Sequence, residues 1–471
     1  MKNLLLGCIL ILPLAAGGTL SASPLPQEAI ATATQLRDQA LAGSGAWEVV
    51  ESLTTEVGPR LAGTPADARA VAWAVEKFRG MGFDRVYTEP VRFPVWRRGH
   101  ERAEVVAPWP QPLYVTALGR SVGTGGRIEA EVLEFSTLQD LEAAPEGSLA
   151  GKIAYISHRM ERMRNGRGYG PAAAARGTGA SLAARKGAVA FLLRSVGTDS
   201  DRLPHTGTMR YEDGVPRIAA AALSNPDADL LSNMLRRGQP VTLALDIDAG
   251  MDGEYESANV IAEVRGRERP DEIVIIGGHL DSWDLGTGAI DDAAGVAITA
   301  RAGALIAALP QRPRRSVRVV AFANEEQGLL GGFAYAKAHA DDITRHVTGA
   351  ESDFGAGRIY AFSTSAVPEG AREVVEQIAG ALAPLGIEHR PGEGSAGPDL
   401  IPMAQRGMAW AWLAQDGSDY FDYHHTANDT LDKVEAAALD QNVAAYAVFT
   451  WLAAESEVDF GSAPKTPPER P

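Results

Sequence analysis

A glycine-rich loop near the middle of the chain carries a histidine and several carboxylates at a spacing that could bind a metal. Residues 277–292 contain His279, Asp281 and Asp291, and they directly follow the apolar run Ile273–Ile276. That run is typical of a buried strand in a parallel sheet, and sites in such sheets form beyond the carboxyl ends of the strands. Imidazole and carboxylate groups are ligands of zinc-like ions. The loop therefore predicts one part of a metal site.

Three later segments carry the same kinds of side chain. Glu325 and Glu326 follow the apolar run 317–322, Asp353 lies two residues before Gly355, and a pair of histidines comes last. The candidate metal ligands are His279, Asp291, Glu326, Asp353 and His425. Five such ligands, with one bridging carboxylate, are enough for two zinc-like ions with room for a water between them.

Two further carboxylates are expected to support the metal rather than bind it. Neighbouring residues at a strand end project in different directions, so Glu326 can bind metal while Glu325 faces the substrate as a general base. Asp281 lies two residues after His279 and could reach the second nitrogen of its ring. A loop histidine, a glutamate pair and a helix-capping aspartate each have ordinary structural explanations. Their joint occurrence after successive strands favours the metal site.

Alternating strands and helices must position these groups. The pattern predicts an α/β fold with a mostly parallel mixed sheet and helices on both faces. A helix is expected over 65–80 and a strand over 83–87. Residues 104–255 differ, with short β-like runs at 127–133, 152–156, 189–193 and 241–245 around an alanine-rich helix at 172–188. This stretch predicts a compact inserted α/β module.

The ends of the chain are expected to lie outside the folded domains. Residues 1–23 resemble a secretory signal, with Lys2 before an apolar core, so we expect a secreted or periplasmic protein. Cys8, the only cysteine, lies in this segment, so the mature protein has no disulfide. The expected regions are a signal peptide (1–23), a first peptidase part (24–103), the insert (104–255), a second peptidase part (256–458) and a disordered tail (459–471).

The composition narrows the classes of partner. The chain has 471 residues, 45% of them hydrophobic, and a formal net charge of −16. Such a length allows more than one domain. An acidic surface argues against nucleic acid and anionic lipid as partners, so we expect no nucleic acid and no membrane partner after signal removal.

The motifs together resemble the zinc-dependent exopeptidases that include carboxypeptidase Q, bacterial leucyl aminopeptidase and glutamate carboxypeptidase II, and the carboxypeptidase Q branch most. The segments that carry the resemblance are Gly-Gly-His279-Leu-Asp281-Ser-Trp-Asp, Gly-Ala-Ile-Asp291-Asp292, Asn324-Glu325-Glu326-Gln-Gly-Leu, Glu351-Ser-Asp353, His424-His425-Thr-Ala-Asn-Asp429-Thr and Gly58-Pro59-Arg60-Leu61-Ala62-Gly63-Thr64. The insert resembles the protease-associated domain of several members.

The resemblance implies a peptide substrate and two zinc ions. Asp291 would bridge the ions, His279 and Asp353 would serve one, and Glu326 and His425 the other, with Glu325 as the base. His424 stands where some relatives have a tyrosine that polarises the scissile carbonyl, so it either takes that role or packs. The resemblance, together with the turn that Asp291 must make, also predicts a cis peptide bond to Asp292. Relatives are often dimers, so a homodimer is compatible with the resemblance.

Two alternative functions remain open at this stage. The site could remove residues from the amino end of peptides rather than from the carboxyl end. A pocket for a substrate carboxylate needs cations, and the basic cluster Arg159, Arg162, Arg164 and Arg167 either reaches the site or forms a solvated loop. A non-catalytic receptor or binding protein on the same fold is the second alternative. The presence of all five ligand positions and of Glu325 argues against it.

Overall fold

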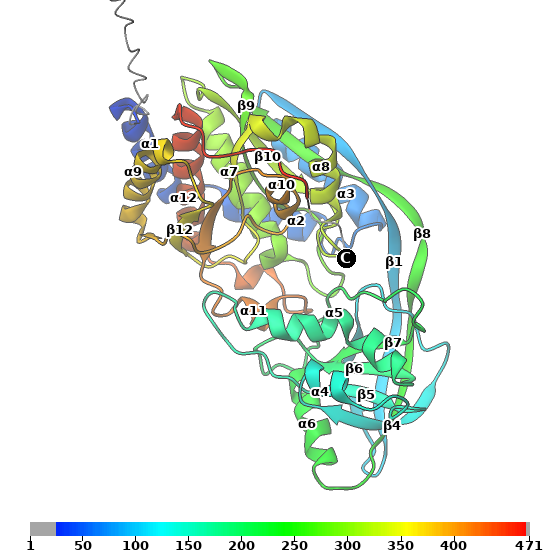
Figure 1. Cartoon of the computed structure of the whole chain (residues 1–471). Helices are drawn as coiled ribbons and strands as arrows, with labels where there is room; N and C mark the ends of the chain where they lie inside the picture. Colours follow the sequence, from blue (N-terminus) through cyan, green and yellow to red (C-terminus); the bar gives the residue numbers. More distant parts are fainter. Residues whose placement is uncertain (1–24, 468–471) are drawn as a thin grey trace, which may run out of the picture.

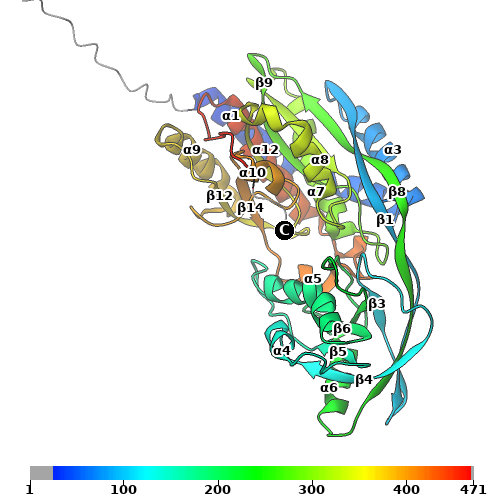
Figure 2. The same ribbon diagram turned by 45° about the vertical axis from the view of Figure 1, so that its right-hand side comes forward.

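The computed structural model describes residues 25–467 and divides them into a larger and a smaller part (Figure 1). Both views place helices α4, α5 and α6 in the smaller part and most other helices in the larger one (Figure 2). The predicted signal segment 1–23 lies outside the described residues, as do residues 468–471. Within the described stretch, no helix combines the length and the apolar character that crossing a membrane requires.

Two long strands join the parts. Strand β1 (Arg85–Ala107) and strand β8 (Thr242–Val264) pair antiparallel along their whole length, with irregularities in register near residues 94–96 and 98–101. The run 241–245, predicted as a short strand, is therefore only the beginning of β8. The expected insert boundaries fall within these two strands, so one continuous sheet passes from the larger part into the smaller one.

The larger part contains a mixed sheet, which confirms the α/β class. Strands β9 (Arg269–His279), β10 (Arg315–Phe322) and β11 (His346–Glu351) are parallel in the order β11-β9-β10, and β10 pairs antiparallel with β8. Val274 and Ile276 pack into the core on one face, whereas Ile273 and Ile275 pack into the core on the other. Burial on both faces explains the continuous apolar run.

Helices cover both faces of this sheet. One core contains residues of α1 (Gln27–Leu41), α2 (Ala46–Glu56), α3 (Pro65–Gly80), α7 (Ala294–Ala307) and α12 (Ala436–Glu455), and the other contains residues of α8 (Leu330–Ala338) and α10 (Ile401–Gln405). Helix α3 has the predicted bounds. Its first turn is capped by Thr64, whose hydroxyl accepts a hydrogen bond from the Asp67 amide.

The smaller part is built on four parallel strands. The order is β4 (Ile128–Phe135), β5 (Ile153–Ile156), β6 (Ala190–Arg194) and β7 (Ala219–Leu223), with β3 (Val115–Ala117) antiparallel at the edge. Its helices are α4 (Leu138–Ala143), α5 (Tyr169–Arg185) and α6 (Asn225–Leu235). The remaining elements are β2 (Gln111–Leu113), β12 (Ile359–Thr364), β13 (Glu388–His389), β14 (Ala411–Gln415), α9 (Arg372–Leu382) and α11 (Tyr420–Tyr423), together with short helices at 289–293, 340–345, 369–371, 383–385 and 431–433.

The start of the expected disordered tail is packed, which differs from the expectation. Phe460 is buried, and the Ser462 hydroxyl donates a hydrogen bond of 2.6 Å to the His346 carbonyl. The Ala463 amide bonds to the Gly407 carbonyl at 2.9 Å. One buried aromatic ring and these bonds hold a segment whose proline-rich, charged composition suggests disorder.

Candidate metal centre

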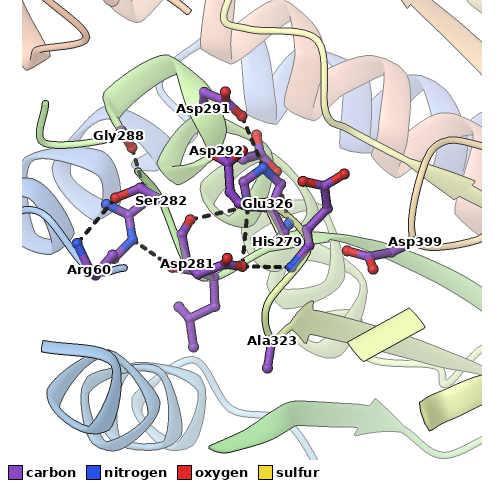
Figure 3. Close-up of polar contacts among 12 residues, drawn as sticks. Arg60, His279, Asp281, Ser282, Gly288, Asp291, Asp292, Ala323, Glu326 and Asp399 are labelled. Carbon is purple, nitrogen blue, oxygen red and sulfur yellow. Dashed lines mark hydrogen bonds and ion pairs between the residues drawn. The ribbon is translucent and has the colours of Figure 1, made fainter. Parts of the chain in front are cut away.

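The predicted site residues meet at one edge of the sheet in the larger part. His279 is the last residue of β9, Glu325 and Glu326 follow the end of β10, and Asp353 follows the end of β11. The carboxyl ends of parallel neighbours lie at the same edge, which brings the three loops together. Figure 3 shows His279, Asp281, Asp291 and Glu326 gathered in one cluster.

Asp291 lies between two groups of side chains. Its Oδ1 is 3.0 Å from His279 Nε2, and its Oδ2 is 3.4 Å from His425 Nε2. His279 Nε2 is also 3.6 Å from Asp353 Oδ1, and His425 Nε2 is 3.0 Å from Glu326 Oε2. The structure therefore brings together all five predicted ligands, with one carboxylate shared between two sets.

The backbone at Asp291 has the predicted conformation. The peptide bond between Asp291 and Asp292 is cis, which confirms that prediction. Asp292 bonds to both β9 and α7. One of its carboxylate oxygens accepts a hydrogen bond of 3.0 Å from the His279 amide, and the other accepts one of 2.8 Å from the Gly295 amide. Asp292 thus ties the last residue of the strand to the first turn of the helix.

The second ring nitrogen of each candidate histidine ligand faces a main-chain carbonyl. His279 Nδ1 is 3.1 Å from the Asp281 carbonyl oxygen and 3.6 Å from Asp281 Oδ1, so the main chain of Asp281, not its carboxylate, is the nearer partner. His425 Nδ1 is 3.3 Å from the carbonyl oxygen of Thr206. A hydrogen on Nδ1 in each ring leaves the Nε2 lone pair free to bind a cation.

The chemistry of this cluster fits a bound cation. Asp291 Oδ2 and Glu326 Oε1 are buried oxygens with no hydrogen-bond partner among the described residues. Burial raises the pKa of Glu326 well above its usual range, and the neighbouring charge of Asp291 raises it further. Burial likewise raises the pKa of Asp291, against the lowering effect of its bond to His279. Buried carboxylates with free oxygens are stabilised by a metal, and the mixed imidazole and carboxylate set suits zinc.

Glu325 lies beside the cluster without joining it. It is half-buried, and its amide donates a hydrogen bond of 3.0 Å to Asp281 Oδ1, so Asp281 fixes the loop that carries it. Burial raises the pKa of Glu325 well above its usual range; His279 lowers it, and Asp353 and Asp399 raise it further. A carboxylate with a raised pKa is a stronger proton acceptor, which suits a general base.

His424 has a packing environment of its own. Its ring is stacked on His425, with centroids 3.5 Å apart, and it also contacts Tyr420 at 4.9 Å. His424 Nε2 is 3.6 Å from Asp291 Oδ2, whereas its Nδ1 is buried and has no hydrogen-bond partner among the described residues. Of the two histidines, only His425 faces both Asp291 and Glu326.

The basic cluster of the insert is divided by the structure. Arg159 forms an ion pair of 2.7 Å with Asp229, and Arg167 is exposed; within the described residues, neither arginine pairs with a candidate metal ligand. Arg162 and Arg164 pair with Asp422 and Asp416 and line a cavity of about 660 Å³. The cavity is also lined by Ile290 and Phe354, which are chain neighbours of Asp291 and Asp353, and by Tyr420, whose ring contacts His424.

Several residues of the site were given no role from the sequence, although Arg60 and Asp429 stand in the quoted motif segments. Arg60 is fully buried and donates hydrogen bonds to the carbonyls of Leu280, Thr287 and Gly288, at 2.6, 2.6 and 2.9 Å, which fastens both ends of the glycine-rich loop (Figure 3). Asp429 accepts the amides of residues 289 and 290, and burial raises its pKa to about 7. Asp399 lies on the other side of the cluster and has no sequence signal of its own.

Comparisons with known proteins agree with one another. The profile of Peptidase family M28 matches residues 259–450. Carboxypeptidase Q of Homo sapiens is 33% identical over 412 residues, covering 87% of this chain and 85% of that protein. A crystal structure of a peptidase M28 precursor from Shewanella amazonensis has a TM-score of 0.90 and 51% identity, covering 94% of this chain and 99% of that one. A zinc aminopeptidase from Bacillus subtilis shares the fold, with a TM-score of 0.63 and 18% identity over 89% of this chain and 98% of that one.

Proposed function

The chain belongs to peptidase family M28 and is a peptidase, and from this premise we propose that its carboxylate and histidine cluster is the catalytic centre of a dizinc exopeptidase. The observation that carries the proposal is the position of Asp291, whose two oxygens face two different histidines, His279 and His425. One carboxylate between two sets of ligands is the arrangement that a pair of metal ions needs.

The ligands divide between two ions in this proposal. His279 and Asp353 would hold one ion, Glu326 and His425 would hold the other, and Asp291 would bridge them; the distances within each set support this division. When bound, zinc supplies Lewis-acid chemistry, which lowers the pKa of water and polarises a carbonyl oxygen.

Glu325 is the proposed general base. Its carboxylate takes the proton from the attacking water and returns it to the nitrogen of the leaving amine, so the proton is conserved through the reaction. The raised pKa of Glu325 supports both halves of this role. Asp281 holds the Glu325 amide, which keeps the base in a fixed position beside the cluster.

We infer that the substrates are dipeptides or short peptides cleaved as in carboxypeptidase Q. The likeness to that protein over most of both chains supports this preference, and Arg162 and Arg164 line the neighbouring cavity. Cleavage from the amino end is the alternative. Assays with a free dipeptide, an N-blocked dipeptide and an aminoacyl anilide separate the two. Hydrolysis of the N-blocked dipeptide without the anilide indicates a carboxypeptidase, and the reverse result indicates an aminopeptidase.

The two histidines at the centre are predicted to differ in their effect on metal content. We expect His425→Ala to lose one equivalent of zinc more readily than His424→Ala, because His425 alone faces both Glu326 and Asp291. Zinc content measured after dialysis tests this. The stacked neighbour serves as the matched control, and greater loss from His424→Ala would show that the ligand had been misassigned.

The protein is proposed to act outside the cytoplasm, in the periplasm or after secretion. The support is the signal-like sequence of residues 1–23, which lies outside the described residues. A homodimer remains compatible with the family. A binding protein without catalysis is disfavoured, because the five ligands and Glu325 lie around one point; purified protein without zinc would favour it instead.

A further inference from the structure

The insert contacts the metal centre through the main chain of the two adjacent histidines. The Thr206 amide donates a hydrogen bond of 3.0 Å to the His425 carbonyl. In return, His425 Nδ1 faces the Thr206 carbonyl at 3.3 Å. One residue of the insert therefore meets both the backbone and the ring of a proposed zinc ligand, although the two are 219 residues apart in the chain.

His425 needs such support because its backbone is strained. Its φ of +63° lies in the left-handed region, which non-glycine residues adopt only where surrounding structure holds them. The bond from Nδ1 to the Thr206 carbonyl also sets the tautomer of the ring, which leaves Nε2 facing Glu326 and Asp291. Both the orientation and the tautomer of the ligand thus depend on the insert.

His205, the residue before Thr206, also holds this turn. Its Nδ1 donates to the His424 carbonyl at 2.7 Å, and its Nε2 donates to Asp199 Oδ1 at 2.8 Å. The side chains of His205 and Asp199 are 0% and 4% exposed, so this pair is buried.

The pair is itself fixed by the insert. Asn225 donates to Asp199 Oδ1 at 2.7 Å, and the Ser195 hydroxyl accepts the His205 amide at 2.8 Å. A Cβ added at Gly197 would lie 2.3 Å from the His205 ring, so the ring packs closely against the Gly197 backbone. Its bond to the His424 carbonyl therefore has little freedom to move.

We propose that His205, oriented by Asp199, is a positioning residue of the metal centre, and that the insert thereby completes the binding site of the ion held by His425 and Glu326. This inference rests on the proposed dizinc function. It assigns to the insert a part in binding metal, in addition to any contact with substrate.

Two conservative variants separate positioning from packing. The amide nitrogen of Asn is attached at the same carbon position as His Nδ1, so His205→Asn can keep the bond to the His424 carbonyl. Gln places its nitrogen near the position of Nε2, so His205→Gln can keep only the bond to Asp199. We expect His205→Gln to weaken zinc binding at one of two sites by about 10-fold, the lower end of the usual cost of losing a partner that bonds a ligand directly, because His205 acts through the His424 carbonyl, and we expect His205→Asn to retain most of the affinity.

Two measurements test these expectations without an activity assay. The zinc stoichiometry is measured after dialysis, and the zinc affinity is measured by competition with a chromophoric chelator. The same substitutions at His100 are the matched control, because His100 forms an exposed pair with Asp246 at 3.0 Å in the long strands. If His205→Gln fails to fold, Asp199→Asn replaces it, and we expect a smaller loss at the same site.

The outcomes separate this inference from the proposed function. Wild-type protein with two zinc ions, and unchanged zinc affinity in His205→Gln or in its replacement Asp199→Asn, would overturn the inference alone. Equal losses in the Asn and Gln variants, with a lower melting temperature in both, would assign His205 to packing and also overturn it. Wild-type protein that binds no zinc would overturn the proposed function and this inference with it.

Discussion

Replacing Glu325 with glutamine is expected to reduce kcat by about 100- to 10,000-fold, the usual contribution of a general base. Glutamine keeps the size and the polarity of the side chain but cannot accept the proton. The carboxylate of Glu325 is not among the atoms that face His279 or His425, so zinc content is expected to remain at the wild-type level.

Steady-state kinetics and metal analysis on the same preparation check this result. Glu325→Asp is the matched control, since it keeps a carboxylate but shortens its reach, and we expect an intermediate rate. Turnover of Glu325→Gln within a few-fold of wild type would remove Glu325 from the mechanism. A rate loss accompanied by loss of zinc would instead assign Glu325 to metal binding.

Removal of the metal is expected to abolish hydrolysis and to lower the melting temperature. The five ligands come from four separate segments of the chain, and a metal that binds only the native state stabilises it by mass action. At a free zinc concentration about 1,000 times Kd, this stabilisation is about 4 kcal/mol per site. Two sites together give about 8 kcal/mol, and at the lower end of roughly 2–4 °C per kcal/mol, which suits a larger protein, the melting temperature is expected to fall by on the order of 15 °C.

Dialysis against a chelator, followed by its removal, yields the protein for this test. Activity and thermal unfolding are measured before and after zinc is returned, with magnesium as the control, because magnesium prefers a site with all-oxygen ligands. We expect zinc to restore both properties and magnesium to restore neither. Undiminished hydrolysis by protein shown to be free of metal would contradict the proposed mechanism.

Much of the larger part could be predicted because its signals are local. The run Ile273–Ile276 is apolar at every position since it is buried on both faces, and helix α3 begins after Thr64 and ends at Gly80 because its capping residues stand in the sequence. His279, Glu326 and Asp353 lie at or just after the ends of parallel strands, which bring such positions to one edge, whereas Asp291 and His425 stand in the short motifs of the family resemblance. For these reasons the five ligand positions could be named without the structure.

The length of β8 could not be predicted in the same way. Only residues 241–245 of this region are predicted as a strand, yet the strand continues past Gly250, because β1 pairs with it on both sides of an irregularity near residues 252–253. Glycine is disfavoured in strands, and pairing with a partner about 150 residues away in sequence outweighs that preference. The packed segment at Phe460 is a similar case, because its hydrogen bonds go to His346 and Gly407.

The sequence by itself determined the family, the α/β class and the candidate ligands, because residue types and short spacings carry that information. The tertiary structure alone decided what orients those ligands. It placed the main-chain carbonyl of Asp281 on His279, brought Thr206 and His205 from the insert to His425 and His424, and fastened the loop with Arg60. Each of these contacts joins a ligand or its loop to a backbone group, and a backbone group is the same at every position. The residue types in the sequence therefore do not predict these contacts.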